Sequence, residues 1–445
     1  MSSELPSGWV RTTIGEINVY SSSNIDPLKE PDQVFELYSV PIYSTGRPEY
    51  QLGQDIGSTK QAVEPDDVLL CKINPRINRV WIVGPKSESP QIGSSEWVVI
   101  RQPLIHAGFL RYQLSGHSFR EKLCSEVSGV GGSLTRAQPK KVATYSVVLP
   151  PLAEQTRIAQ KLDELLAQVD TLKARIDAIP ALLKRFRQSV LAAAVSGRLT
   201  ENWRKGEPAN WTALTIADLI DGKPRNGYSP KAVEYDTGVK SLSLSATTSG
   251  IFKGEYFKYV DQEISKESYL WLQPGDILIQ RANTLEYVGV SAIYEGDPLE
   301  YIYPDLMMKC RAKDRVLTKF LYFCLSSQKV RKHFRDHATG TAGNMPKINQ
   351  HTVMNAPALL PPLAEQTEIV RRVEQLFAFA DQLEAKVATA QARIDRLTQS
   401  ILAKAFRGEL VPQDPNDEPA SVLLERIQAQ RAAAPKARRG RKATA

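Results

Sequence analysis

The sequence predicts an α+β protein in which two mixed α/β domains are separated by two long helices, which form an antiparallel coiled coil with an approximate two-fold axis. Two observations predict this fold. Residues 149–199 return as residues 360–410, displaced by 211 positions without a gap, and 23 of the 51 aligned positions are identical. The stretches between the copies share little identity but carry similar motifs in the same order. One rigid element used twice therefore carries two unlike domains, which suggests one kind of task performed at two places.

The repeated segment has the residue pattern of a long helix. Apolar residues follow one another at alternating steps of four and three, from Ile158 to Ala193 in the first copy and from Ile369 to Ile401 in the second. This is the spacing of a coiled-coil seam. Within each copy the expected helix starts after a proline pair and ends near a glycine, and both are ordinary helix boundaries. Because the heptad register continues through Pro180, we expect a kink there within one continuous helix.

Each helix must bury a narrow apolar stripe, and its simplest partner is the other helix. Since a variable domain separates the two helices in the chain, an antiparallel pair is favoured. The expected organisation comprises a first variable domain (1–148), a first helix segment (149–203), a second variable domain (204–359), a second helix segment (360–412), a C-terminal segment (413–430) and a basic disordered tail (431–445).

The two variable domains share a layout. Each starts at a tryptophan, Trp9 or Trp211, and each has a Pro-x-Asp turn ahead of an apolar strand, at residues 65–70 and 274–279. Each strand is followed by a cationic and an amide side chain, and each domain later has a basic helical segment and a glycine-rich loop. Two mixed α/β domains of one fold are therefore expected.

Composition places the chain among soluble globular proteins, with 42% hydrophobic and 24% charged residues. The sequence shows no signal peptide, no apolar run of membrane-spanning length and only four scattered cysteines, so we expect a cytoplasmic protein. The net charge of +8 is concentrated at the C-terminus, where the last fifteen residues hold six Lys and Arg and no acid. Any DNA affinity of the remaining chain must come from local patches or from partners. For the tail, weak phosphate contact and a dedicated binding role both stay open.

The sequence lacks the motifs of enzymes that act on DNA by themselves. No Walker-type phosphate loop, nuclease-like acidic motif, adenine-methyltransferase tetrapeptide or nucleophile elbow occurs. One alternative is a zinc site at His333 and His337 with two cysteines, Cys310 and Cys324, but these cysteines are too far apart for a usual zinc pair. A basic helix that faces solvent or phosphate is the preferred interpretation, and we expect neither a metal site nor a catalytic residue.

Candidate DNA-binding residues cluster at matching places in both variable domains. Base readout uses Arg or Lys for guanine and Asn or Gln for adenine, while hydroxyls and backbone amides hold phosphates. In the first domain the candidates are Ser44, Arg47, Lys72, Asn74, Arg76, Asn78, Arg79, Ser133, Arg136 and Lys140. In the second domain they are Arg225, Asn226, Tyr228, Lys231, Thr247, Arg281, Asn283, Thr284, Asn344, Lys347 and Asn349. Each residue alone could belong to an ordinary surface loop, but the recurrence of the clusters favours a DNA interface.

Several longer motifs carry a resemblance to a known family. They are Leu149–Thr156, Leu360–Thr367, Leu183–Leu191, Glu368–Leu376, Thr398–Leu410 and Ser421–Ile427, with Leu285–Val290 and Tyr303–Asp305 in the second variable domain. With these motifs the sequence resembles the specificity subunits, HsdS, of type I restriction–modification enzymes, and most of all their type IA group.

The resemblance implies a non-catalytic subunit whose variable domains are target-recognition domains. Each would read one half of a bipartite, asymmetric site in double-stranded DNA, and the helix pair would fix the unread spacer. Two methyltransferase (M) subunits would methylate adenine N6 with S-adenosylmethionine, and two restriction (R) subunits would add translocation and cleavage that need ATP and Mg²⁺. This chain itself would bind no cofactor.

Two other function classes stay open. A self-contained DNA methyltransferase or nuclease is disfavoured by the missing motifs. A coiled-coil scaffold that binds DNA or protein partners without sequence readout is the main alternative.

Overall fold

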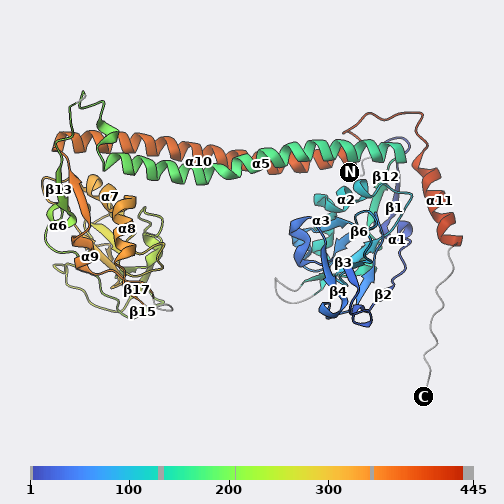
Figure 1. Ribbon diagram of the computed structural model, residues 1–445, viewed down its shortest axis with the longest axis horizontal. Helices are drawn as coiled ribbons and strands as arrows, with labels where there is room; N and C mark the ends of the chain where they lie inside the picture. The colour runs from blue at the N-terminus through green and yellow to red at the C-terminus, as the bar shows by residue number, and fades with distance from the viewer. Residues whose placement is uncertain (1–3, 129–134, 206, 341–344, 434–445) are drawn as a thin grey trace, which may run out of the picture. The chain divides into compact units, whose positions relative to one another are not determined.

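The computed structural model describes residues 4–128, 135–205, 207–340 and 345–433 (Figure 1). Its contacts divide the chain into two compact units, of which the first unit comprises residues 1–176 and 390–445 and the second unit residues 177–389. Each unit therefore contains one variable domain and part of each long helix. None of the helices in the described part of the chain combines the length and the apolar character that a membrane span requires.

The first unit is built on small, mainly antiparallel sheets. A five-stranded sheet has the order β2-β5-β8-β3-β4, a three-stranded sheet has the order β7-β6-β9, and two further pairs join β1 to β12 and β10 to β11. The strands are β1 (Val10–Thr13), β2 (Asn24–Ile25), β3 (Val34–Tyr38), β4 (Glu49–Leu52), β5 (Lys60–Ala62), β6 (Val68–Cys71), β7 (Val80–Ile82), β8 (Gln91–Gly93), β9 (Trp97–Ile100), β10 (Val127–Ser128), β11 (Arg136–Ala137) and β12 (Ser146–Leu149). The short helices are α1 (Ile14–Ile17), α2 (Ala107–Ser115), α3 (His117–Ser125) and α4 (Pro139–Val142).

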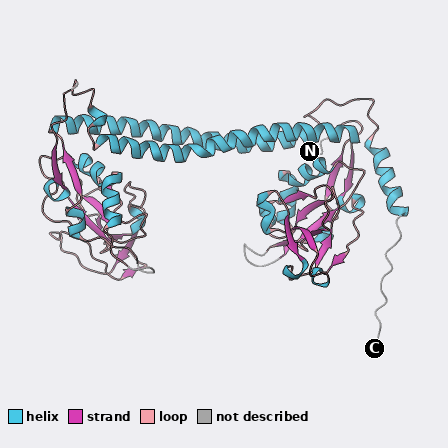
Figure 2. Cartoon of the chain, viewed as in Figure 1, coloured by secondary structure: helices cyan, strands magenta, loops and turns pink. Residues whose placement is uncertain are grey.

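The second unit has a similar composition of sheets and short helices (Figure 2). Two four-stranded sheets have the orders β14-β21-β18-β19 and β15-β17-β16-β20, and β13 pairs with β22. The strands are β13 (Thr212–Thr215), β14 (Arg225–Asn226), β15 (Ala232–Val233), β16 (Lys240–Leu242), β17 (Phe257–Val260), β18 (Ile277–Gln280), β19 (Ser291–Ile293), β20 (Tyr301–Ile302), β21 (Met307–Cys310) and β22 (Pro357–Leu360). The short helices are α6 (Ile216–Leu219), α7 (Thr318–Ser326), α8 (Gln328–Asp336) and α9 (Gln350–Met354).

A fully buried strand lies inside a sheet of each unit, where the Pro-x-Asp motifs predict one. Strand β6 lies between β7 and β9, and β18 lies between β21 and β19. The motif aspartate before each strand is buried and paired with a cation: Asp67 with Arg101 at 2.6 Å and Asp276 with Arg311 at 2.9 Å. Such pairing is what a buried carboxylate requires. The expectation of two mixed α/β domains is confirmed.

The two repeated segments form the long helices α5 (Leu152–Ala194) and α10 (Leu363–Phe406). Helix α5 continues through Pro180 as one helix. In the second unit Arg187 of α5 pairs with Asp381 of α10 at 2.6 Å, while Arg372 donates to the carbonyl of Leu199 at 2.8 Å. Residue 187 therefore lies beside residue 381, and residue 199 lies beside residue 372. The two segments run in opposite directions, so the predicted antiparallel pairing is confirmed within this unit.

The apolar stripe of the helices is mostly buried, as the heptad pattern predicts. In the first unit Ile158 and Leu162 of α5 belong to the same core cluster as Ile401 of α10. Leu172 and Leu397 depart from the prediction, since they are 49% and 47% exposed. Leu183 of α5 and Ile401 of α10, further along each helix, are buried again, so the two exposures are local and the heptad register itself continues.

The eight residues that open each repeat attach the helix to its domain. In the first unit Gln155 accepts from the backbone amide of His106 at 3.0 Å and donates to the carbonyl of Pro150 at 2.9 Å. In the second unit Gln366 accepts from the amide of Leu317 at 2.9 Å and donates to the carbonyl of Pro361 at 3.0 Å. Both glutamines are buried. The identical letters of the repeat therefore encode an identical attachment.

The C-terminal segment belongs to the first unit, where helix α11 (Ala420–Ala433) buries Ala420, Leu423 and Ile427 in the domain core. The guanidinium of Arg431 donates to the carbonyl of Glu16 at 2.6 Å. The expectation that the disordered tail begins at residue 431 is wrong, because helix α11 extends to Ala433 and its last turn is held by this contact. Residues 434–445 lie outside the described residues.

We predict that Gln366→Leu lowers the free energy of unfolding by about 1–3 kcal/mol, because it leaves the partly buried amide of Leu317 without its acceptor. Urea titration of the purified protein measures the change. The control is Gln382→Leu on the exposed face of the same helix, which should change stability by less than about 0.5 kcal/mol. Equal effects of the two substitutions would contradict the proposed attachment.

Candidate nucleic-acid interface

In the first unit, the loop after the buried strand β6 pairs with the chain that follows the glycine-rich loop. Ala137 donates its amide to the carbonyl of Lys72 at 2.8 Å, and Asn74 donates its amide to the carbonyl of Thr135 at 2.9 Å. Between these contacts Ile73 and Arg136 form an isolated antiparallel bridge. The two sequence clusters of candidate residues are therefore brought together.

The second unit repeats this arrangement with different side chains. Ile348 donates its amide to the carbonyl of Arg281 at 2.9 Å, and Asn283 donates its amide to the carbonyl of Pro346 at 3.2 Å. Ala282 and Lys347 form the bridge between them. We name the paired segments of each unit, residues 72–79 with 135–137 and residues 281–284 with 345–348, its recognition platform.

The two platforms place chemically similar groups at the same backbone positions. Lys72 corresponds to Arg281, and Asn74 corresponds to Asn283. A cation followed two residues later by an amide is the combination that can read guanine and adenine edges. The recurrence predicted from the sequence is thus present in three dimensions.

The first platform is shaped by two asparagines in left-handed backbone conformations, Asn74 with φ 48° and Asn78 with φ 52°. Asparagine tolerates this region better than most residues. The side-chain amide of Asn78 donates to the carbonyl of Ser115 at 2.7 Å, and no described residue pairs with its buried oxygen. The prediction that Asn78 contacts DNA is not supported by this geometry, because its donor already anchors the loop to helix α2.

Charge on the first platform is partly neutralised within the protein. Arg136 is 53% exposed along its side chain and pairs with Glu96 at 2.9 Å. Arg76 is exposed on the loop, whereas Lys72 and Arg79 are half-buried. Ser44 and Arg47 are exposed on a segment that Tyr43 holds against Val80 at 3.4 Å, and Lys140 is exposed on helix α4. The exposed side chains of Ser44, Arg47 and Lys140 therefore face solvent.

In the second unit, strand β14 brings Arg225 and Asn226 beside strand β21, where Arg225 lies over the ring of Tyr269 at 5.2 Å. The next residue, Gly227, lies so close to the carbonyls of Tyr303 and Pro304 that an added Cβ would be 2.2 Å and 2.3 Å from their oxygens. A side chain at position 227 is excluded, and this close packing fixes the path of the segment that carries the candidates.

The motif Tyr303–Asp305 connects that segment to the second platform. Arg281 donates to the carbonyl of Asp305 at 3.2 Å, and the hydroxyl of Ser229 donates a hydrogen bond to the Asp305 carboxylate at 2.5 Å. Tyr228 is 46% exposed and Lys231 is exposed nearby in the chain. Arg281, Tyr228 and Asp305 therefore come from one connected surface region.

Two predicted contact residues have supporting roles. Thr247 is fully buried and accepts from Gln280 at 3.0 Å, so its expected contact with DNA is wrong. The Gln280 amide oxygen in turn accepts from Asn283 at 2.7 Å, which links Thr247 to the platform. Asn349 is the N-cap of helix α9 and accepts from Thr352 at 2.8 Å, so its acceptor serves the helix.

The remaining candidates have different outcomes. Asn283 and Thr284 lie on the second platform, where the Thr284 amide donates to the Asn283 side chain at 2.8 Å, and Lys347 is exposed beside them. Ser133 and Asn344 lie outside the described residues.

Sequence reasoning missed Glu96, Gln280 and Tyr269, which shape the platforms and have no motif of their own. Among the residues that support the platforms, Asp305 could be found from the sequence, because it belongs to the motif Tyr303–Asp305.

The cysteines and histidines of the zinc alternative serve separate purposes in the structure. Cys310 and Cys324 are buried in the core of the second unit, where burial raises the pKa of both thiols to about 12. His333 and His337 stack on each other with ring centroids 4.2 Å apart. Among the described residues, no group of three metal-ligating side chains comes together.

The basic helix α8 uses much of its charge internally. Arg331 donates to the carbonyls of Val288 at 2.5 Å and Glu286 at 2.8 Å, and burial lowers the pKa of its guanidinium to about 10. Lys332 pairs with Asp336 at 2.5 Å. The interpretation of α8 as a phosphate-facing helix is therefore weakened for these two cations.

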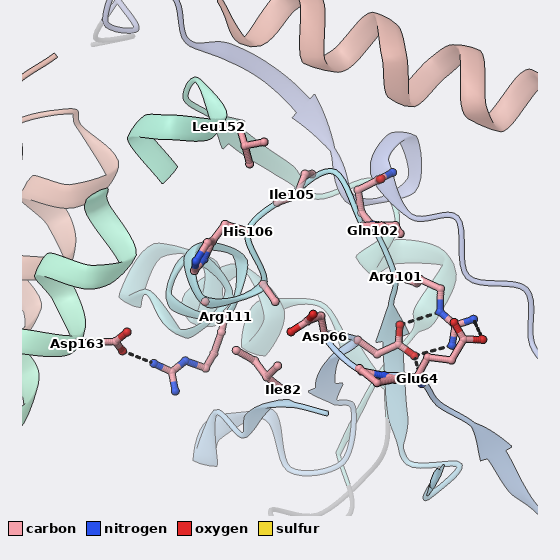
Figure 3. A pocket seen from close by; sticks show the side chains of 15 residues that line it. Glu64, Asp66, Ile82, Arg101, Gln102, Ile105, His106, Arg111, Leu152 and Asp163 are labelled. Atoms are coloured by element: carbon pink, nitrogen blue, oxygen red, sulfur yellow. Dashed lines mark hydrogen bonds and ion pairs between the residues drawn. The ribbon is translucent and has the colours of Figure 1, made fainter. Parts of the chain in front are cut away.

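A cavity of about 640 Å³ beside the start of α5 contains charged side chains that are paired with each other (Figure 3). Arg111 pairs with Asp163 at 3.2 Å, and Arg101 pairs with Glu64 at 2.7 Å. None of the candidate DNA-binding residues lines this cavity in the described structure. The platforms, and not this cavity, are the candidate interface.

Comparison with known proteins places the chain in a family. The family described as "Type I restriction modification DNA specificity domain" matches residues 208–390. The specificity subunit of the type I restriction enzyme EcoKI from Escherichia coli K12 is 36% identical over 390 residues, which cover 84% of this chain and 82% of that protein. The StySPI specificity subunit of Salmonella potsdam is 35% identical over 344 residues, which cover 74% of this chain and 73% of that protein. The chain belongs to the specificity subunits of type I restriction enzymes.

Solved structures agree with this assignment at the level of the fold. The HsdS subunit from Thermoanaerobacter tengcongensis is similar with a TM-score of 0.58 and 22% identity, over 92% of this chain and 99% of that one. A chain from a study of type I restriction–modification complex assembly is similar with a TM-score of 0.69 and 21% identity, over 92% of this chain and all of that one. The predicted α+β fold with two long helices is confirmed.

The protein is therefore the DNA sequence-specificity subunit of a type I restriction–modification system and a non-catalytic part of that enzyme complex. The specificity-subunit role expected from the sequence is confirmed, and a self-contained methyltransferase or nuclease is set aside.

We predict that one thiol of the native specificity subunit reacts rapidly with Ellman's reagent at about pH 8, namely the partly exposed Cys124. Burial raises the pKa of the other three thiols, so they stay protonated and unreactive until the chain unfolds. The reaction is followed by absorbance before and after denaturation. Release of zinc together with further thiols on adding a chelator would revive the zinc alternative.

Proposed function

We propose that each variable domain of this specificity subunit reads one half of a bipartite, asymmetric site in double-stranded DNA. The target-recognition domains are assigned to residues 1–148 and 204–359, the helix segments to residues 149–203 and 360–412, and a C-terminal segment to residues 413–433, where helix α11 ends. The observation that carries the proposal is the platform built twice, with a cation and an amide at matching backbone positions.

The platforms combine the two properties that half-site reading requires. Their backbone frame is the same in both units, because each loop is bonded to the chain after the glycine-rich loop at the same positions. Their side chains differ, since Lys72 stands where the second unit has Arg281. A common frame gives a common approach to DNA, and different side chains give different target bases.

Catalysis belongs to the partners in this proposal. Two methyltransferase (M) subunits carry S-adenosylmethionine and methylate adenine N6 in each half-site, and two restriction (R) subunits carry the ATP- and Mg²⁺-dependent translocation and cleavage. Methylation requires that an adenine leaves the base stack, which is easier on DNA held at both half-sites. The role of this chain is to position the partners on the correct sequence.

We predict that Arg281→Ala relaxes base preference in one half-site, and that Lys72→Ala relaxes it in the other. Loss of a bidentate contact should reduce discrimination by about 1–3 kcal/mol at the affected position. Competition binding with duplexes mutated in either half-site, in the presence of the M subunits, measures it. Two outcomes contradict half-site reading: both variants affect the same half, or the wild type shows no preference over random duplex, as a scaffold without readout would.

We also predict that the number of residues in the helices determines the unread spacer of the DNA site. Insertion of one heptad between Val169 and Ile179, together with the same insertion at the matching place in α10, keeps the apolar register and should lengthen the spacer. Methylome sequencing of cells that express the variant with its M subunits reads the spacer directly. An unchanged spacer with active methylation would rule the idea out.

A further inference from the structure

The two repeat openings each contain a buried glutamate, and the second unit shows how such a carboxylate is satisfied. Glu365 is 2% exposed. One of its oxygens accepts from the indole of Trp211 at 2.9 Å, and the other accepts from the hydroxyl of Thr200 at 2.6 Å and from the guanidinium of Arg204. A buried carboxylate with an ion-pair partner and two neutral donors is a complete arrangement.

The first unit has the same glutamate without the same partners. Glu154 is 1% exposed, and one oxygen accepts from the indole of Trp9 at 3.0 Å. Its other oxygen, Oε1, is buried and has no hydrogen-bond partner among the described residues. Residues 211 positions after Thr200 and Arg204 are Val411 and Pro415, which offer neither a hydroxyl nor a guanidinium.

The nearest cation does not fill the gap. Arg157 lies one helical turn after Glu154 and pairs with Asp417 at 2.6 Å. Burial raises the pKa of Glu154, with the Trp9 hydrogen bond and the charge of Arg157 acting in the opposite direction. Leaving a buried carboxylate oxygen unpaired is costly, so the site favours an added donor with positive charge.

The unpaired glutamate lines a cavity of about 520 Å³ on the first unit. Asp414 and Asp417 line the same cavity, together with Trp9 and Gln413, and no Lys, Arg or His is among the described residues that form it. The segment that departs from the repeat, residues 411–419, supplies much of the wall. The cavity is therefore acidic, and its wall includes Pro415, the residue 211 positions after Arg204.

The chemistry of the site selects an organic cation. No group of three metal-ligating side chains occurs among the described residues, which disfavours a metal ion. A guanidinium has several donors in a plane, and the second unit already binds this group at the equivalent glutamate. We propose that the cavity at Glu154 receives an arginine side chain from a protein partner, which takes the place that Arg204 occupies at Glu365.

The partner is a methyltransferase subunit of the complex, an identification that rests on the proposed function. A cavity of opposite charge at the attachment of α5 gives such a subunit one defined anchor on the first unit. Because the second unit fills its own site with Arg204, this anchor exists on one unit and not on the other. The two units are thereby distinguishable to the partner.

The test titrates the full-length chain with the purified methyltransferase subunit and measures the dissociation constant. Glu154→Gln keeps the size and the Trp9 contact but removes the charge, and it should weaken association at least about tenfold without lowering the melting temperature of the isolated chain. Glu425→Gln on the exposed face of α11 is the matched control and should bind as the wild type does.

A second variant fills the cavity from within. The double substitution Val411→Thr and Pro415→Arg copies the residues of the second unit and should compete with the partner's arginine, again weakening association about tenfold. Glu365→Gln provides the contrast, because it should lower the melting temperature by removing the charge that pairs with Arg204 while leaving partner affinity unchanged.

Three results would overturn the inference. Glu154→Gln or the double variant could bind the methyltransferase subunit within twofold of the wild type. Deletion of residues 434–445 could strengthen association of the wild type but not of Glu154→Gln, which would make the chain's own basic tail the occupant. Wild-type protein could fail to bind the methyltransferase subunit at all, and only this result would also overturn the proposed function.

Discussion

The buried glutamate–glutamine pair at the start of each long helix is the contact on which the rest of each unit depends. Gln155 and Gln366 fasten the helix to backbone groups of the domain, while Glu154 and Glu365 accept from the indole of the first aromatic residue of that domain. Both side chains are buried, so the geometry is set by a small number of directional bonds and a mismatch would leave polar groups unpaired. This explains why the repeat is most faithful at its opening and less so along the helix, where any apolar residue of suitable size can fill the stripe.

The platforms follow from the same constraint. A helix fixed at its first turn fixes the sheet pairs that flank it, β1 with β12 and β13 with β22, and the central buried strands lie within the same small domains. The loops that leave β6 and β18 are then held by backbone bonds to the chain after each glycine-rich loop. Since the bonds between the paired segments use main-chain groups alone, side chains such as Lys72 and Arg281 can differ without altering that pairing. A specificity subunit needs this separation, because new target sequences require new side chains on an unchanged scaffold.

Much of this architecture could be predicted from the sequence, because it is encoded by periodicity and repetition. The heptad pattern gave helices α5 and α10, and the shared motif order gave two domains of similar layout. The details of the interface could not be predicted in the same way. Thr247 belongs to a polar cluster in the sequence, but in the structure it is buried and accepts a hydrogen bond from Gln280. The side-chain oxygen of Asn349 accepts from the amide of Thr352 and caps helix α9. Both outcomes depend on partners far away in the chain or on exact helix boundaries, which a linear pattern does not contain. Leu172 and Leu397 were expected in the buried stripe but are exposed, a local departure that the heptad pattern does not contain.

The place where the repeat stops is as informative as the repeat itself. After the first copy the chain must continue into a second domain, and the connecting segment supplies Thr200 and Arg204 to Glu365. After the second copy the chain instead leads to helix α11, and the residues on the way, Val411 and Pro415, supply nothing to Glu154. The two glutamates, Glu154 and Glu365, lie at the same attachment of a helix to its domain but have different neighbours. The difference arises because the chain that follows each copy of the repeat leads to a different element. If the duplicated protein reads an asymmetric DNA site, as proposed, its partners benefit from a difference between its halves beyond the recognition loops. The unpaired carboxylate of Glu154 is such a difference, and it lies in the identical opening of the repeat, where the proposed partner contacts the scaffold.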